Sequence, residues 1–98
     1  MDILSEASEI VNNDRGRDYG HPADNDARIA QLWGPVLGIE VDPKLIPLLM
    51  ILVKIAREVH YPKRDNRVDI AGYAQTLQMH YDREEEENEA RVSHSPSK

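Results

Sequence analysis

The chain has 98 residues, of which 40% are apolar and 31% are charged, and it contains no cysteine. This length allows one small domain, and the lack of cysteine excludes disulfides, thiolate zinc sites and cysteine nucleophiles. The sequence has no run of 18 apolar residues and begins without the basic stretch of a signal peptide, so we expect no membrane association and a cytoplasmic location. The formal charge is −6, and residues 1–81 and 82–98 each carry three more acidic than basic side chains. The nearly balanced first part argues against sequence-specific DNA binding.

The first two predicted helices are separated by a loop. Apolar residues at helical spacing predict a short helix over residues 3–11. Residues 12–22 contain two glycines and a proline and have little to bury, which is typical of a loop. A second helix is expected from Pro22 or Asp24 to Leu37, with Gly38 as its stop. Its predicted buried residues are Ile29, Leu32, Trp33, Val36 and Leu37.

The third predicted helix is apolar on most of its surface. Asp42 and Pro43 are suited to its cap and first turn, although Pro47 favours a start nearer to Ile46. Between residues 45 and 59, only a lysine, an arginine and a glutamate interrupt the apolar side chains. A helix of this kind is central in a bundle or covered by a partner subunit, so we expect self-association, most simply as a dimer.

The fourth predicted helix begins at Asp65 or Asn66, after a short turn at residues 61–64. Its predicted buried face is formed by Val68, Ala71, Ala74, Leu77 and Gln78. Gly72 lies within this helix, where glycine costs about 1 kcal/mol relative to alanine, so we expect another helix to approach closely there.

One folded unit followed by a tail is the predicted organisation. Residues 84–98 show no apolar periodicity and are predicted to form an acidic, disordered tail. Residues 1–83 are expected to form a single domain. Because no alternating strand pattern competes with the helical ones, the predicted fold class is all-α, a small bundle of about four helices.

The predicted loop carries the first group of candidate ligand-binding residues. Its last six residues read Arg-Asp-Tyr-Gly-His-Pro, which places hydrogen-bond donors, an acceptor and a stacking ring close together. The candidates are Arg17, Asp18, Tyr19 and His21. The alternative is a solvated connector whose glycines only turn the chain.

Charged residues on the third and fourth predicted helices form the second candidate group. Lys54, Arg57 and Glu58 lie near one side of the third helix, and Asp65 and Asp69 are one turn apart on the fourth. An antiparallel hairpin would bring Asp69 toward Lys54 or Arg57. The two aspartates could then hold Mg²⁺ while the two cations hold phosphates. A set of salt bridges without a ligand is the alternative.

The chain resembles a group of small phage and prophage proteins. Their pattern is a Tyr-Gly-His-Pro loop, a helix with a tryptophan, an apolar helix with lysine and arginine, and an Asp-Ile-Ala-Gly-Tyr helix. These features stand here at residues 17–22, 32–33, 54–57 and 69–73, and the resemblance covers about residues 3–80. It implies a phage protein that acts in the cytoplasm of the host cell.

A more distant similarity is to the all-α nucleoside triphosphate pyrophosphohydrolases of the MazG and dUTPase-like kind. Those proteins form four-helix cores, usually as dimers or tetramers. They split a nucleoside triphosphate into the monophosphate and pyrophosphate with Mg²⁺ held by acidic residues on two helices. The similarity implies a MazG-like bundle, dimeric or higher, with Mg²⁺ as its cofactor.

The sequence departs from this enzyme family at the acidic positions. Asp69 stands where the second motif has its aspartate, and Asn66 stands where that motif has glutamate. Lys54 and Arg57 occupy the acidic positions of the first motif. The resemblance therefore implies a reduced site, in which Asp69, Asp65 and Glu58 are the candidate catalytic residues.

Three functions are expected as alternatives. The first is a protein of nucleotide metabolism that binds a (d)NTP, and hydrolyses it to (d)NMP and pyrophosphate if catalysis is retained. In that case the cations would contact the phosphates, and Tyr19 or Tyr73 would pack on the base. The second is a non-catalytic phage protein that binds and inhibits a host component. The third is a nucleotide sponge on a degenerate MazG-like fold.

Overall fold

The computed structural model describes residues 1–93, and these form helices and their connections, with no strand among them. The elements are α1 (Ile3–Glu9), the π-helix η1 (Ile10–Arg15), α2 (Gly16–Tyr19), α3 (Pro22–Leu37), α4 (Leu45–His60) and α5 (Arg64–Ser93). The predicted fold class, a small all-α bundle, is thereby confirmed for the described residues. Residues 94–98, the last part of the predicted disordered tail, lie outside them.

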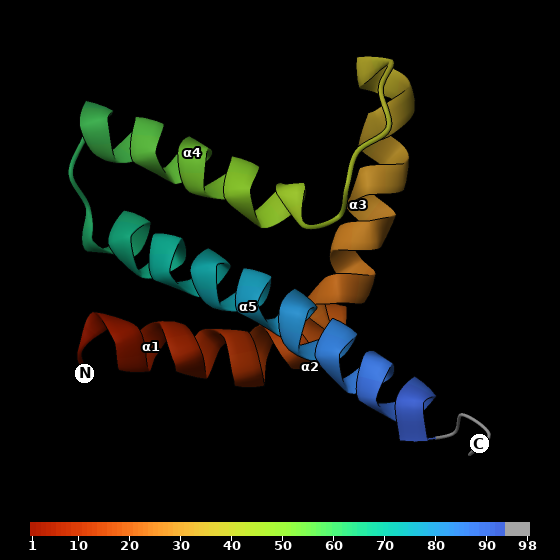
Figure 1. Ribbon diagram of the computed structural model, residues 1–98. Coiled ribbons are helices and arrows are strands. Elements are labelled where there is room, and N and C mark those ends of the chain that lie inside the picture. The colour runs from red at the N-terminus through yellow and green to blue at the C-terminus, as the bar shows by residue number, and fades with distance from the viewer. Residues whose placement is uncertain (94–98) are drawn as a thin grey trace.

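α5 is the central element of the bundle (Figure 1). α4 and α5 form an antiparallel hairpin, and α1 packs along α5 on the side away from α4. α3 stands across one end of this layer, where it contacts both α4 and α5. The first half of α5, which carries the predicted aspartates, therefore lies between α4 and α1.

Small side chains let the N-terminal segment approach α5 closely. The stripe that α5 buries has a four-residue spacing and consists of Val68, Gly72, Thr76 and His80. A Cβ atom built on Gly72 would lie 3.5 Å from Cγ2 of Val11, so the close approach predicted at this glycine is confirmed. The predicted buried face of α5 is wrong for Ala74 and Gln78, which are exposed. Hydropathy did not identify the true stripe, because two of its four members are polar and one is glycine.

The loop predicted over residues 12–22 is wrong for most of its length. The N-terminal helix widens into η1, continues as α2 and ends at Gly20, whose φ angle is 79°. Arg15 on η1 donates a hydrogen bond of 2.9 Å to the hydroxyl group of Tyr73 on α5. This contact with a distant helix stabilises a segment that buries little apolar surface of its own.

α3 has the predicted bounds but only part of the predicted buried face. Pro22 occupies its first turn, and Gly38, with a φ angle of 75°, ends it. Its apolar cluster consists of Ala30, Val41 and Ile46, with Ile29, Trp33 and Met50 packed against it. Three residues predicted to be buried are exposed, namely Leu32, Val36 and Leu37. The reason is that α3 extends beyond the layer that it crosses, so one side of it has nothing to pack against (Figure 1).

α4 begins at Leu45, between the two starts that the sequence allowed, Pro43 and Ile46. Before it, the side chain of Asp42 accepts a hydrogen bond of 2.9 Å from the backbone N–H of Lys44. α5 runs without a break through residue 83, where the tail was predicted to begin, and reaches residue 93. Arg83 pairs with Asp24 of α3 at 2.5 Å, and the next residue of α5, a glutamate, pairs with Lys44. These ion pairs hold α5 in place at the predicted boundary.

A buried polar pair joins α3 to α5. Oδ2 of Asp26 lies 2.7 Å from Nε2 of His80, and the two side chains are almost fully covered. Burial raises the pKa of Asp26 above its usual value, and the hydrogen bond to His80 acts in the opposite direction.

Within residues 1–93, no helix has the combination of length and apolar character that crossing a bilayer requires.

Candidate functional site

Lys54 of α4 faces Asp69 of α5, as the sequence predicted. The Nζ atom of Lys54 lies 3.0 Å from Oδ2 of Asp69. The lysine side chain is 14% exposed and the aspartate side chain is 35% exposed. The short turn between the two helices makes them antiparallel, so residues at similar distances from the turn meet. The hairpin therefore contains an ion pair in which the lysine is largely shielded from water and the aspartate is partly exposed.

A groove with a volume of about 620 Å³ opens beside this ion pair. We call it the α4–α5 slot, and it is lined chiefly by Lys54, Arg57, His60, Tyr61, Lys63, Asp65 and Asp69. Lys54 and Asp69 neutralise each other, and two cations, Arg57 and Lys63, stand against one remaining carboxylate, that of Asp65. The slot thus brings together four predicted site residues and has a positive balance.

Three residues of the slot were not among the predicted site residues. His60 and Tyr61 end α4, and Lys63 lies in the turn before α5. The sequence carried one signal for His60, because it stands three residues after Arg57 and therefore on the same side of the helix. The positions of Tyr61 and Lys63 depend on the path of the turn, which helical periodicity does not describe.

Glu58, the third predicted catalytic carboxylate, does not line the slot. Its carboxylate accepts hydrogen bonds from the backbone N–H of Lys63 (3.0 Å), from Nδ2 of Asn66 (3.2 Å) and from Arg67. The pKa of Glu58 lies below its usual value, chiefly because of the Lys63 N–H. This arrangement fixes the turn and the start of α5, which is a structural use of the carboxylate.

The described residues do not complete a metal site by themselves. Within residues 1–93, no three His, Cys, Asp or Glu side chains converge on a point that a metal ion could occupy. Asp65 and Asp69 share the slot, but Asp69 is already paired with Lys54. The Mg²⁺ site at these two aspartates stays a prediction.

The candidate residues of the N-terminal segment lie outside the slot. Arg17 is exposed and pairs with an aspartate three residues earlier, and Asp18 is exposed on the same short helix. Tyr19 is 56% exposed. Nδ1 of His21 accepts a hydrogen bond of 3.0 Å from the backbone N–H two residues later and so caps α3, and burial lowers its pKa.

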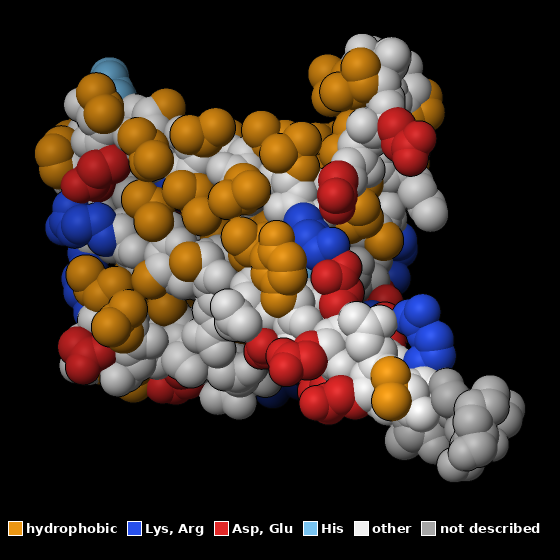
Figure 2. Space-filling model, viewed as in Figure 1, with side chains coloured by type: hydrophobic (Ala, Val, Ile, Leu, Met, Phe, Trp, Pro, Cys, Tyr) orange, Lys and Arg blue, Asp and Glu red, His pale blue; other side chains and the backbone are white. Residues whose placement is uncertain are grey.

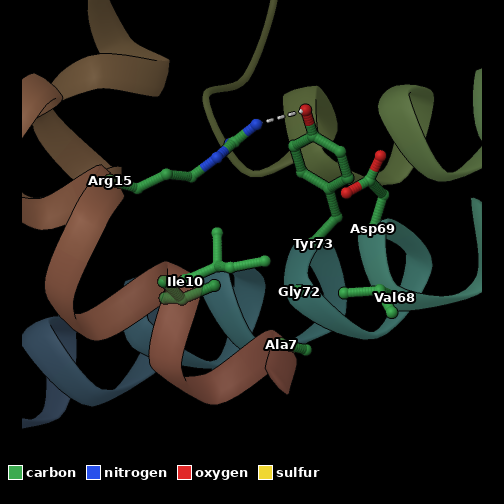
Figure 3. Close-up of a pocket in the computed structure, with 8 residues that line it drawn as sticks. Ala7, Ile10, Arg15, Val68, Asp69, Gly72 and Tyr73 are labelled. Atoms are coloured by element: carbon green, nitrogen blue, oxygen red, sulfur yellow. Dashed lines mark hydrogen bonds between the residues drawn. The ribbon is translucent and has the colours of Figure 1, made fainter. Parts of the chain in front are cut away.

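Tyr73, the remaining candidate, is held by Arg15 beside a small cavity (Figure 3). The Arg15 guanidinium also lies over the ring of Tyr73, 4.8 Å from its centre. Asp69 lines both this cavity and the slot, so it separates the α1 side of α5 from the α4 side. Arg15 was not predicted as a site residue, because its partner is 58 positions away in the sequence.

Comparison with known proteins places the chain beside phage sequences. A family described as a domain of unknown function (DUF6378) matches residues 2–81, a region that contains every residue of the slot. The chain is 48% identical over 81 residues to the gene 55 protein of Mycobacterium phage L5 and 40% identical over 82 residues to the gene 55 protein of Mycobacterium phage D29. These alignments cover 80% and 82% of this chain but 51% and 54% of the relatives, so the chain spans about half their length. No solved structure matches the chain significantly.

Proposed function

The chain belongs to the DUF6378 family of phage proteins, and we propose that it binds a nucleotide through its phosphates in the α4–α5 slot. The observation that carries this proposal is the convergence of Lys54, Arg57 and Lys63 on one groove of about 620 Å³. Sites for small molecules have volumes of about 300–1,000 Å³. The slot therefore has both the size and the charge for a phosphorylated small molecule.

Two cations of the slot are available to an anion. Among the described residues, Arg57 and Lys63 form no ion pair. Guanidinium groups bind phosphate oxygens with two parallel hydrogen bonds, and lysine acts as a point charge beside them. Lys54 would join these two cations when a phosphate competes with Asp69 for its ammonium group.

Tyr61 is the aromatic residue best placed to contact the base. It lines the slot and is 66% exposed, so its side chain is accessible to a base. Tyr19 and Tyr73, which were predicted for this role, do not line the slot. We therefore assign the contact with the base to Tyr61 in this proposal.

Hydrolysis is a further step that the slot supports less directly. Mg²⁺ usually keeps several waters and is held by one or two carboxylates together with the phosphates of the substrate. Asp65 and Asp69 would be those carboxylates, and the ion would neutralise phosphate charge and activate a water molecule. Because two cations, Lys54 and Arg57, line the same slot as these carboxylates, the function that we propose for the slot is nucleotide binding. Cleavage to (d)NMP and pyrophosphate stays a prediction.

Calorimetric titration of the protein with each dNTP and with inorganic triphosphate, first without Mg²⁺, tests this proposal. We expect Arg57→Gln to weaken binding by about tenfold or more, because it removes a charge-assisted hydrogen bond. Arg17→Gln is the matched control, since Arg17 is an exposed arginine outside the slot. Asp69→Asn should strengthen binding in the absence of metal, because it releases the ammonium group of Lys54.

The outcomes separate the three expected functions. No binding by any compound would refute nucleotide binding and favour a protein that acts on a host component. Equal losses in the two arginine variants would refute the slot as the binding site. Binding without turnover in the presence of Mg²⁺ would indicate a nucleotide sponge. Release of pyrophosphate that Asp69→Asn abolishes would extend the proposal to hydrolysis. In each nucleotide-binding case we expect the protein to act in the cytoplasm of the infected cell.

A further inference from the structure

An apolar line runs along the outer side of α4 and belongs to a larger apolar surface (Figure 2). We call it the α4 seam, and its members are Leu45, Leu48, Leu52, Ile55 and Val59. Their spacing alternates between three and four residues, as in the core positions of a coiled coil. All five are exposed, from 39% at Leu45 to 81% at Val59. The seam is about 21 Å long, at 1.5 Å per residue.

The single chain leaves more surface open to water than its mass predicts. Its accessible surface is 6991 Å², whereas a folded monomer of 11.2 kDa exposes about 5,700 Å². Part of the difference comes from the end of α5, which projects from the bundle (Figure 1). Among the described residues, ten of the sixteen exposed large apolar side chains lie between residues 32 and 59. The difference is of the same order as the roughly 800 Å² that each partner buries in a standard interface.

We propose that a second copy of this chain covers the α4 seam, with the two α4 helices packed antiparallel about a two-fold axis. Leu52 is the middle member of the seam, so the axis would place it against Leu52 of the partner subunit. The same axis would pair Leu45 with Val59 of the partner subunit. A line of apolar residues that is symmetric about its centre is self-complementary, as a two-fold interface requires.

The helix dipoles also favour the antiparallel arrangement. In an antiparallel pair the positive N-terminus of one α4 helix lies near the negative C-terminus of the other.

The proposed dimer leaves the slot open. On a helix that turns 100° per residue, Lys54 and Arg57 lie about 140° and 160° from the middle of the seam. Those side chains therefore face away from the second copy. Self-association is independent of nucleotide binding, and either proposal can fail without the other.

Sedimentation equilibrium on the full chain is the first test. We expect a mass twice the 11.2 kDa of the chain at micromolar concentration, and a monomer mass for Leu52→Glu. Leu52 is 60% exposed in the single chain, so the circular dichroism of this variant should remain helical. Leu4→Glu on α1, at a residue that is 74% exposed, is the matched control and should leave the dimer intact.

A second test uses the absence of cysteine from the chain. Leu52→Cys should form a disulfide between two copies on mild oxidation, because the axis brings the two side chains within bonding distance. Val59→Cys should not, because its two copies would be separated by about 21 Å along the helices. A monomer mass for the unchanged chain, a mass above the dimer, or efficient cross-linking of Val59→Cys would each overturn the proposal.

Discussion

Replacing Asp69 with asparagine leaves the ammonium group of Lys54 without its counter-ion, at a position where the lysine side chain is only 14% exposed. At 3.0 Å the attraction between the two charges is about 1.4 kcal/mol in water and about 5.5 kcal/mol at an effective dielectric constant of 20. The loss of hydration offsets most of the larger figure. The pair should therefore contribute about 1–2 kcal/mol to the free energy of unfolding.

The two single substitutions should have unequal effects. Asp69→Asn should cost about 1–2 kcal/mol, which corresponds to a fall in Tm of about 4–8 °C for each kcal/mol in a domain of this size. Lys54→Met keeps the apolar stem and leaves an aspartate that is 35% exposed and can regain water, so it should cost less than about 0.5 kcal/mol. The double variant should resemble Lys54→Met alone, because it leaves no buried charge.

Urea unfolding followed by circular dichroism measures these differences. All variants should be compared at one protein concentration, because self-association would add to the apparent stability. Asp65→Asn, at an exposed aspartate of the same slot, is the control and should change stability little. Equal losses for Lys54→Met and Asp69→Asn, or a larger loss for the lysine variant, would refute the argument that burial of the lysine determines the cost.

Two further predictions concern stability. Gly72→Ala should raise the free energy of unfolding by about 1 kcal/mol, because the added Cβ atom would lie at an ordinary contact distance of 3.5 Å from its neighbour. Gly34→Ala should give no such gain, because its Cβ atom would lie only 2.9 Å from the carbonyl oxygen of Ile39. Thermal unfolding of the two variants would contradict this if both were stabilised alike. Because the pKa of Glu58 is lowered in the folded protein, the Glu58 carboxylate of the unfolded chain is protonated first as pH falls. The stabilisation that the ionised Glu58 provides is therefore complete above about pH 4.5 and is lost below it. Stability should therefore decline less steeply from about pH 5 to 3 in Glu58→Gln than in the unchanged protein, and identical curves would contradict the assignment.

Local signals in the sequence were enough to place most helices. Pro22 and Gly38 fix the ends of α3 through their own backbone geometry, and Asp42 caps the turn before α4, so these bounds needed no knowledge of tertiary contacts. The segment at residues 12–19 could not be predicted in this way. Its contact with the rest of the bundle is made by Arg15 and Tyr73, which are far apart in the chain.

The buried faces were predicted less well than the helices. α3 exposes Leu32 and Val36, and α5 buries Thr76 and His80, so hydropathy alone gives the wrong side in both helices. For α5, packing is governed by small size and by a hydrogen bond to Asp26 rather than by apolar area. For α3, the exposed leucine and valine depend on where neighbouring helices end, which periodicity does not encode.

The centre of the candidate site was predictable because it depends on one short turn. Once α4 and α5 form a tight hairpin, Lys54 and Asp69 must lie near each other, and the structure places them in contact. Glu58 could not be placed from spacing, because its partners belong to the turn and to the first residues of α5. Tyr61 was missed for the same reason.

The π-helix η1 limits how the N-terminal segment can vary in length. Each of its turns holds more residues than a turn of an α-helix, and Arg15, its last residue, reaches Tyr73 only in this register. Gain or loss of one residue between α1 and Arg15 would turn Arg15 around the helix axis and separate it from its partner. Related proteins that keep this contact should therefore accommodate insertions elsewhere, for example in the connection between α3 and α4.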